Sequence, residues 1–188
     1  MKRIIISRID AIGDVLLTLP LAVCIRQKFP DSKIFFLGQD YTKSLVNLCK
    51  SIDEFVSWER IQNEPAYLPS LEADCIVHVF PNRRLATLAR EAGIRVRIGA
   101  TTRWFNFLNC NRWVWVHRRK LNLHEAQMNL MVAKPLGISS NYSLDEISKM
   151  NLIDSEIVDT KLSEYLDANR VNLVIHPGSR GHAPEWGS

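Results

Sequence analysis

Residues 3–20 read RIIISRIDAIGDVLLTLP, and this stretch decides the fold. Its β-branched run at 3–7 is typical of a strand that is buried on both faces in a parallel sheet. Turn residues follow at 10–14, and apolar residues then recur at helical spacing until Pro30. Pro20 marks either the beginning of this helix or a kink in it. The pattern predicts a first, central strand followed by a helix.

Strands and helices continue to alternate through the next hundred or so residues. The predicted strands are 33–38, 54–56, 73–80 and 95–99, and the predicted helices are 44–49, 84–92 and 123–136. Such alternation is typical of a parallel sheet with helical crossovers. We therefore predict an α/β fold, a Rossmann-like parallel sheet with helices on both faces.

The last part of the sequence has a different pattern. Polar and turn residues dominate 139–154, which indicates a connection between domains, and an amphipathic helix is expected at 155–168. A strand at 171–175 then leads into His176-Pro177-Gly178-Ser179, with little sequence left for this strand to pair with. We expect an N-terminal domain over 1–150, with 151–188 contributing a linker helix and the first strand of a second domain.

Composition excludes several classes of protein. Hydrophobic residues make up 46% of the chain and charged residues 23%, as in ordinary soluble globular proteins, and no signal peptide or spanning segment is found. We expect a cytoplasmic protein. The net charge of +4 fits phosphorylated ligands or an anionic membrane surface. The four cysteines lack CxxC spacing and the five histidines lack metal-ligand spacing, so buried thiols and no metal site are expected.

The turn after the first strand is the first candidate site, because ligands of open α/β sheets bind beyond the carboxyl ends of the strands. Gly13 allows a ligand to approach the backbone, and Asp14 places a carboxylate at a helix N-terminus, where negative charge is favoured. Asp14 is therefore a candidate general base, or simply a helix cap. One glycine does not make a dinucleotide fingerprint, and a P-loop lysine is lacking.

Basic residues occur at the same predicted edge of the sheet. Arg8, Arg83 and Arg84 are candidates for binding an anionic acceptor, and for Arg8 a solvated surface position is an equally good explanation. Arginines are interleaved with tryptophans over 103–120, which suits a phosphorylated ligand, a membrane interface or, less favourably, a single-stranded nucleic acid. Trp113 and Trp115 also alternate with valines, as in a strand.

Four motifs in order, and a fifth segment near the end of the sequence, resemble those of glycosyltransferase family 9, the heptosyltransferases. They are the opening GDV-x-x-T-x-P segment at 13–20, RQKFPD at 26–31, RIG at 97–99, and HEAQMNL at 124–130, which is similar to the HE-x-x-x-NL helix of the family. Residues 173–179, LVIHPGS, are similar to the strand and glycine-rich loop that begin the donor domain of the family. The role of His124 and Glu125 is treated as structural, as a helix cap or a lining of the cleft.

The resemblance implies a two-domain GT-B glycosyltransferase whose N-terminal domain holds the acceptor. Such enzymes transfer heptose from ADP-heptose to the lipopolysaccharide inner core with inversion, at the cytoplasmic face of the inner membrane, without a cofactor or metal. The catalytic carboxylate of the family matches Asp14, and Ser179 and Arg180 fall in the donor-side loop. Pro184 stands where relatives carry a phosphate-binding lysine. We expect this half to be inactive alone; the alternative is a non-catalytic binding module that retains only the acceptor cleft.

Overall fold

The computed structural model describes residues 1–116, 122–153, 165–167, 169–173 and 175. The chain divides into two units, Met1–Asp154 and Ser155–Ser188, and each is described by itself. All helices and strands among the described residues belong to the first unit.

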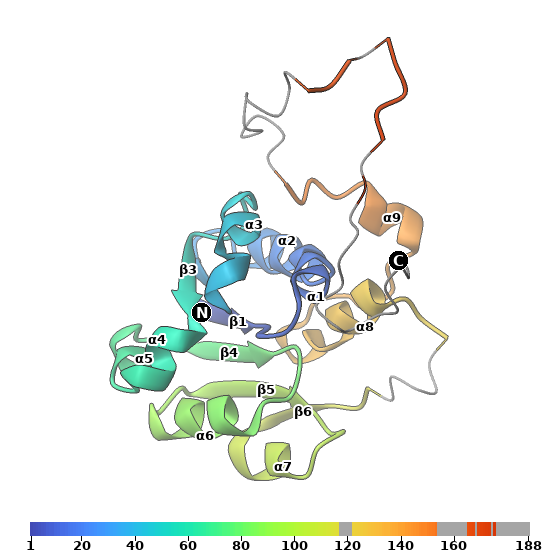
Figure 1. Ribbon diagram of the computed structural model, residues 1–188. Coiled ribbons are helices and arrows are strands. Elements are labelled where there is room, and N and C mark those ends of the chain that lie inside the picture. The colour runs from blue at the N-terminus through green and yellow to red at the C-terminus, as the bar shows by residue number, and fades with distance from the viewer. Residues whose placement is uncertain (117–121, 154–164, 168, 174, 176–188) are drawn as a thin grey trace, which may run out of the picture. The chain divides into compact units, whose positions relative to one another are not determined.

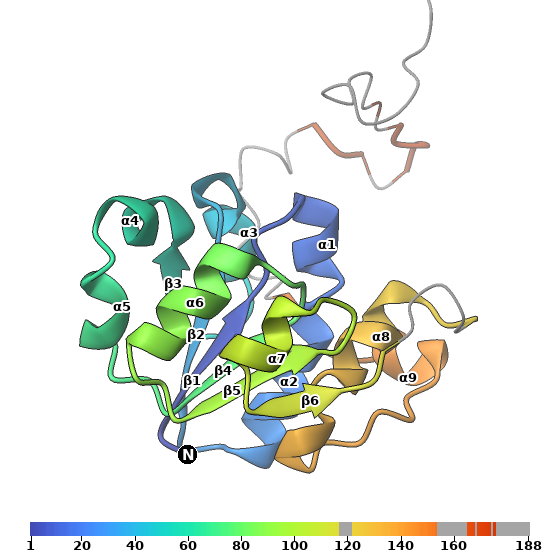
Figure 2. The ribbon, with the colours of Figure 1, turned by 90° about the horizontal axis from the view of Figure 1, so that it is seen from below.

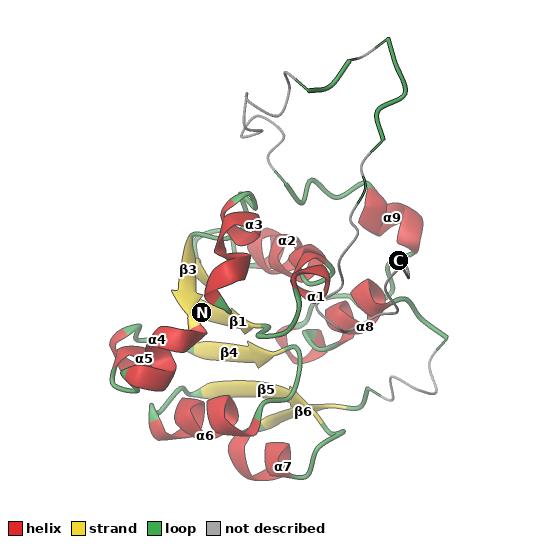
Figure 3. Ribbon diagram, viewed as in Figure 1, coloured by secondary structure: helices red, strands yellow, loops and turns green. Residues whose placement is uncertain are grey.

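The first unit is built on a sheet of six parallel strands in the order β3-β2-β1-β4-β5-β6 (Figures 1 and 3). The strands are β1 Arg3–Ser7, β2 Lys33–Gly38, β3 Glu54–Ser57, β4 Cys75–His78, β5 Val96–Ala100 and β6 Arg112–Val114. β1 lies inside the sheet, with Ile5 paired to Phe35 on one side and to Ile76 on the other. The predicted α/β parallel sheet with a central first strand is confirmed.

Helices cover both faces of the sheet, as Figure 2 shows. Alternate residues of β1 enter different cores, because side chains of a strand point to opposite faces: Ile4 and Ile6 join one cluster, and Ile5 joins the other. The first cluster packs against α1 Ile12–Leu16, α2 Leu19–Lys28, α3 Lys43–Asn47, α8 Glu125–Met131 and α9 Leu144–Ser148. The second packs against α4 Trp58–Asn63, α5 Tyr67–Ser70 and α6 Arg83–Glu91. Burying each isoleucine of β1 stabilises the fold by about 1.5–3 kcal/mol.

The helical region after β1 consists of two helices. α1 ends at Leu16, and α2 begins at Leu19 with Pro20 as its second residue. A proline is accepted at the start of a helix, whereas in the interior its ring would clash with the carbonyl one turn earlier. The Thr18 hydroxyl donates to the Asp14 carbonyl oxygen over 2.8 Å and satisfies one acceptor at the end of α1. Of the two roles considered for Pro20, the structure shows the beginning of a helix.

Several predicted boundaries were wrong. Residues 139–154 were expected to be a connection, but α9 lies there, begun by a capping box between Ser143 and Glu146, and its buried Ile147 joins the first core. The predicted helix 123–136 is shorter: it begins at Glu125 and ends at Met131, and a 3-10 turn, η2 Lys134–Leu136, follows. Sequence analysis missed α4, α5 and α7 Phe105–Asn109.

The predicted strand at 171–175 is not found at its described residues, 171–173 and 175. Val171 is 96% exposed there. The predicted helix 155–168 lies almost entirely outside the described residues.

Candidate functional site

The carboxyl ends of β1 and β4 position the candidate site. Arg8 follows β1 directly, and α1 begins four residues later, so Asp14 lies in the first turn of that helix. The N-cap of α1 is Ala11, which makes no side-chain cap hydrogen bond at the N-terminus of this helix. The alternative role for Asp14, a helix cap, is therefore wrong, and its carboxylate is available for other contacts.

Arg8 is the centre of a charged cluster. Its side chain is only 3% exposed, and its guanidinium is surrounded by three carboxylates. Nε lies 3.0 Å from Asp10 Oδ2, Nη2 donates to Asp14 Oδ1 over 2.8 Å, and Nη1 donates to Glu125 Oε1 over 3.3 Å. The ring of Phe80, which follows β4, lies 5.2 Å from the guanidinium carbon. A buried guanidinium is stable only with such partners, because charge is costly to remove from water.

Asn129 connects this cluster to the helices. Its side-chain oxygen accepts a hydrogen bond from Arg8 Nη1 over 3.3 Å. Its amide nitrogen donates to the Leu17 carbonyl oxygen over 3.0 Å and to Thr18 Oγ1 over 3.3 Å. Asn129 lies on α8, and Leu17 and Thr18 join α1 to α2. The amide therefore fixes α8 against the helix that carries Asp14.

The carboxylate of Asp14 is held but still accessible. The bond to Arg8 orients it, while 37% of its side chain remains exposed. Gly13 beside it is open as well: a Cβ placed there would meet no other atom within 4 Å. The protein's own packing therefore does not require glycine at this position, and the open space leaves room for a ligand to approach the backbone. An oriented, accessible carboxylate beside open backbone can accept a proton from a bound hydroxyl group.

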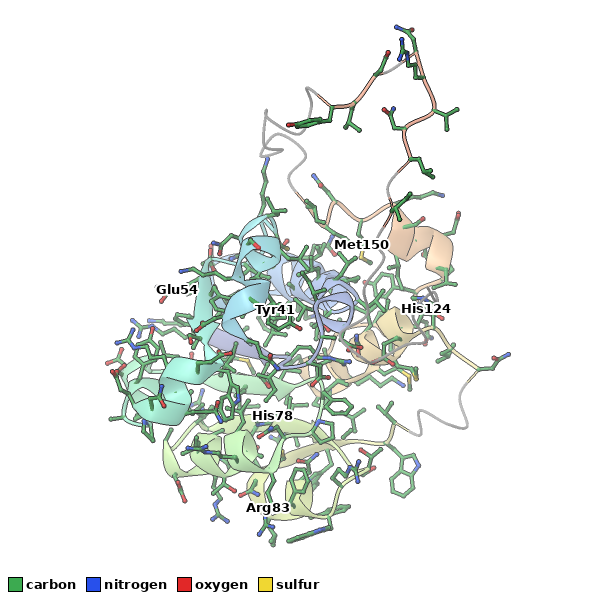
Figure 4. All side chains as sticks on the ribbon, in the orientation of Figure 1. Tyr41, Glu54, His78, Arg83, His124 and Met150 are labelled. Carbon is green, nitrogen blue, oxygen red and sulfur yellow. The ribbon has the colours of Figure 1, made fainter. Side chains whose placement is uncertain are left out.

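The other predicted binding residues either contact groups outside the Arg8 cluster or lie outside the described part. Arg83 and Arg84 are in the first turn of α6, where Arg83 stacks 5.3 Å from the Trp104 ring and Arg84 donates to the Gln62 carbonyl oxygen over 3.0 Å. Figure 4 shows Arg83 well apart from His124, which begins α8. Ser179 and Arg180 lie outside the described residues.

Sequence analysis did not connect three members of the cluster to Arg8: Phe80, Asn129, and Glu125, which it considered only as a helix cap or a lining of the cleft. The motif HEAQMNL gave a signal for two of them, since Glu125 and Asn129 are one helical turn apart and so share a face of α8. His124 is the N-cap of α8: its Nδ1 accepts from the Ala126 amide over 3.3 Å, and Gln127 accepts from the His124 amide. The structural role predicted for His124 is confirmed, whereas Glu125 contacts Arg8.

His78 is the last residue of β4 and is buried. Its Nδ1 lies 3.2 Å from the Ser7 hydroxyl, and burial, with a smaller effect of the Arg97 charge, lowers its pKa to about 4. The imidazole is therefore neutral at physiological pH. Within the described ranges, no group of side chains could hold a metal ion. No helix in the described part of the chain is long and apolar enough to span a membrane.

Comparison with known proteins identifies the class of fold. The chain matches no family model. In structure it is similar to a glycosyl transferase family 9 protein from Veillonella parvula, with a TM-score of 0.62 and 21% identity over 73% of this chain and 42% of that one. It is also similar to E. coli heptosyltransferase WaaC with ADP, with a TM-score of 0.62 and 18% identity over 75% of this chain and 49% of that one. The predicted similarity to this family is confirmed for the fold.

A curated relative comes from Haemophilus influenzae and bears the name "Putative glycosyltransferase". It is 24% identical over 198 residues, which cover 97% of this chain and 56% of that protein. The chain thus spans about half the length of the curated relative and of the solved structures that it matches.

Proposed function

We propose that this chain is the acceptor-side half of a family 9 glycosyltransferase that transfers heptose from ADP-heptose to the lipopolysaccharide inner core. One observation carries the proposal: an accessible Asp14 carboxylate, held by the buried Arg8, lies at the edge of the sheet where ligands bind. The similarity to heptosyltransferase structures with ADP and with ADP-2-deoxy-2-fluoro heptose supports the choice of donor.

In the proposed reaction, Asp14 is the general base. Its carboxylate accepts the proton of an acceptor hydroxyl group while that oxygen attacks the anomeric carbon of the donor sugar. The new carbon–oxygen bond forms as the bond to the diphosphate breaks, and ADP leaves with the electron pair. Attack from the face opposite the leaving group inverts the anomeric centre. This step uses no cofactor or metal.

Arg8 has a positioning role in this proposal, in place of the acceptor binding that its sequence position suggested. The guanidinium is 3% exposed and already contacts three carboxylates, so a bound acceptor phosphate would have to displace one of them. The forked guanidinium instead fixes the direction of the Asp14 carboxylate. Glu125 and Asn129 in turn hold the guanidinium in place through hydrogen bonds to Nη1. A lysine offers one ammonium group in place of that fork. We expect Arg8→Lys to lower kcat by roughly tenfold with little change in KM, because a misdirected base slows the chemical step.

The donor side of the proposed enzyme is assigned to 151–188 and to sequence beyond it, with Ser179 and Arg180 as candidate contacts to the nucleotide sugar. Acceptor binding is assigned to 1–150, with Gly13, Arg83 and Arg84 as candidate contacts. A lipid-linked acceptor also implies peripheral contact with the inner face of the inner membrane.

The test measures heptose transfer from ADP-heptose to a lipopolysaccharide core that lacks heptose. The protein used is this chain together with any coding sequence that follows Ser188, because the matched relatives are about twice as long. We expect Asp14→Asn to lower kcat by at least about 10²-fold. Asp145→Asn is the matched control, since Asp145 is an exposed carboxylate on α9 that pairs with the surface Lys149.

Two results would contradict the proposal in different ways. Full activity of the Asp14→Asn variant would remove Asp14 as the base but leave the transfer reaction. Acceptor binding without any transfer by the unchanged protein would favour the alternative function, a binding module that retains only the acceptor cleft.

A further inference from the structure

An exposed aromatic surface lies at the end of the sheet that is opposite β3. We call it the α7–β6 surface, and its members are Trp104, Phe107, Leu108, Trp113 and Trp115, which are between 50% and 69% exposed. α7 precedes β6, the edge strand of the sheet, and packs against α6 (Figure 2). Single exposed apolar residues are ordinary, but five in one stretch of chain mark an interaction surface.

Local structure brings these side chains together. Trp104 and Leu108 are one helical turn apart and line the same hollow. The rings of Phe107 and Trp113 are 6.2 Å apart. Trp113 and Trp115 share one face of the chain, because the alternate residues Val114 and Val116 are buried in the core. The tryptophans of this segment are therefore exposed, whereas its valines are buried in the core at the edge of the sheet.

The charge of this region points to an anionic partner. Residues 92–124 contain no Asp or Glu and seven of the 24 basic residues, namely Arg95, Arg97, Arg103, Arg112, Arg118, Arg119 and Lys120. This stretch has a formal charge of +7, which leaves 17 basic and 20 acidic residues, a charge of −3, for the rest of the chain. Of these, Arg103 and Arg112 are exposed, and each directly precedes a tryptophan of the surface in the sequence. The aromatic surface thus lies within a strongly basic stretch of the sequence.

A hollow beside the surface adds a place for a phosphate group. It lies between α6 and α7, has a volume of about 230 Å³, and is lined by Arg83 and Arg90 on one wall and by Trp104 and Leu108 on the other. The Arg83 guanidinium stacks on the Trp104 ring at 5.3 Å, so cationic and apolar groups meet at its rim. Guanidinium groups bind phosphate through paired hydrogen bonds, while tryptophan prefers the boundary between lipid and water.

We propose that the α7–β6 surface docks the protein onto a bilayer that contains anionic phospholipid, with a lipid phosphate in the hollow between α6 and α7. Tryptophan, phenylalanine and leucine enter the headgroup region, and the surrounding arginines bind lipid phosphates. A nucleic acid would use the arginines and aromatic rings but would gain little from Leu108, which offers no ring on which a base could stack. The membrane contact that the proposed function implies thus lies at the α7–β6 surface. Binding of this surface to a bilayer does not require transfer activity.

The test uses the purified 188-residue chain and vesicles, with no sugar donor or acceptor. We expect sedimentation with vesicles of phosphatidylcholine and phosphatidylglycerol, and much weaker sedimentation with phosphatidylcholine alone. Each substitution Arg103→Gln or Arg112→Gln is expected to weaken binding by about fivefold, and added salt should weaken it further. Arg60→Gln is the matched control, an exposed arginine on α4 outside this surface.

The aromatic part of the surface is tested separately. Trp104→Ser with Trp113→Ser should weaken binding by roughly tenfold or more, whereas Leu144→Ser, a control with the same 50% exposure as Trp113 but on α9, should leave it unchanged. In the unchanged protein, lipids with brominated acyl chains should quench tryptophan fluorescence, a measurement that needs no variant. Binding without quenching, equal binding by the serine variant, or preference for a single-stranded oligonucleotide over vesicles would each overturn the proposal.

Discussion

Replacing Arg8 with methionine tests whether the charged cluster holds this part of the fold together. Methionine fills most of the space of the arginine stem but removes the guanidinium. In this variant, Asp10, Asp14 and Glu125 lose the guanidinium that lies within 3.3 Å of each carboxylate. The side-chain oxygen of Asn129 also loses its hydrogen-bond donor, Arg8 Nη1. Removing one partner of a buried ion pair costs about 3–5 kcal/mol.

The exposure of the carboxylates reduces this figure. Their side chains are between 23% and 37% exposed, so water can replace part of what the guanidinium provided. We therefore expect Arg8→Met to lower the free energy of unfolding by about 2–3 kcal/mol. Urea unfolding of the 188-residue chain, followed by tryptophan fluorescence, measures this loss as a midpoint lowered by roughly 1 M or more.

A control variant and a double substitution show whether the loss of stability in Arg8→Met comes from the charged cluster. Lys149→Met removes a cation from an exposed pair with Asp145 and should cost only about 0.3–0.5 kcal/mol. If Arg8 and Glu125 act together, combining Arg8→Met with Glu125→Gln should cost about 1–2 kcal/mol less than the sum of the single losses. A loss for Arg8→Met no larger than that for Lys149→Met, or strictly additive losses, would refute the reasoning.

Three further predictions concern buried or open positions. Burial lowers the pKa of His78 from 6.5 to about 4, so the unfolded chain binds this proton at a higher pH than the folded protein does. The contribution of His78 to stability should be complete above about pH 6.5 and should fall by about 3 kcal/mol as the pH drops towards 4. His78→Gln should remove this part of the pH dependence. Gly99→Ala should cost about 1–3 kcal/mol in urea unfolding, since its Cβ would lie 2.7 Å from Cys110 Sγ, and Cys110→Ala should restore part of the loss. Gly13→Ala should instead raise stability by up to about 1 kcal/mol, because Gly13 lies in a helix and the added Cβ would meet nothing within 4 Å. The same substitution should lower heptose transfer, and unchanged transfer would argue against contact between a ligand and the backbone at Gly13.

Much of the first unit could be predicted from local pattern. The β-branched run at Arg3–Ser7 and its alternation with helices implied a parallel sheet, and β2 Lys33–Gly38 was predicted to the residue. Pro20 signalled the start of α2, although not the separate α1 before it. These features follow from side-chain period and backbone geometry within a few residues, which a sequence displays directly. Short elements such as α5 and α7 were missed, because four or five residues give too little periodicity to read.

Only the tertiary structure decided how the site is assembled. The sequence identified Arg8 and Asp14, which are six positions apart, as candidate site residues. It did not show that Glu125 and Asn129 of α8, 117 and 121 positions from Arg8, contact the same guanidinium. It also could not show that α9 packs into the first core. Such contacts depend on which helix faces which end of the sheet, and that is settled by packing of the whole core. The sequence by itself thus determined the parallel sheet and the candidate residue Asp14, and tertiary packing determined that a buried Arg8 holds the carboxylate of Asp14.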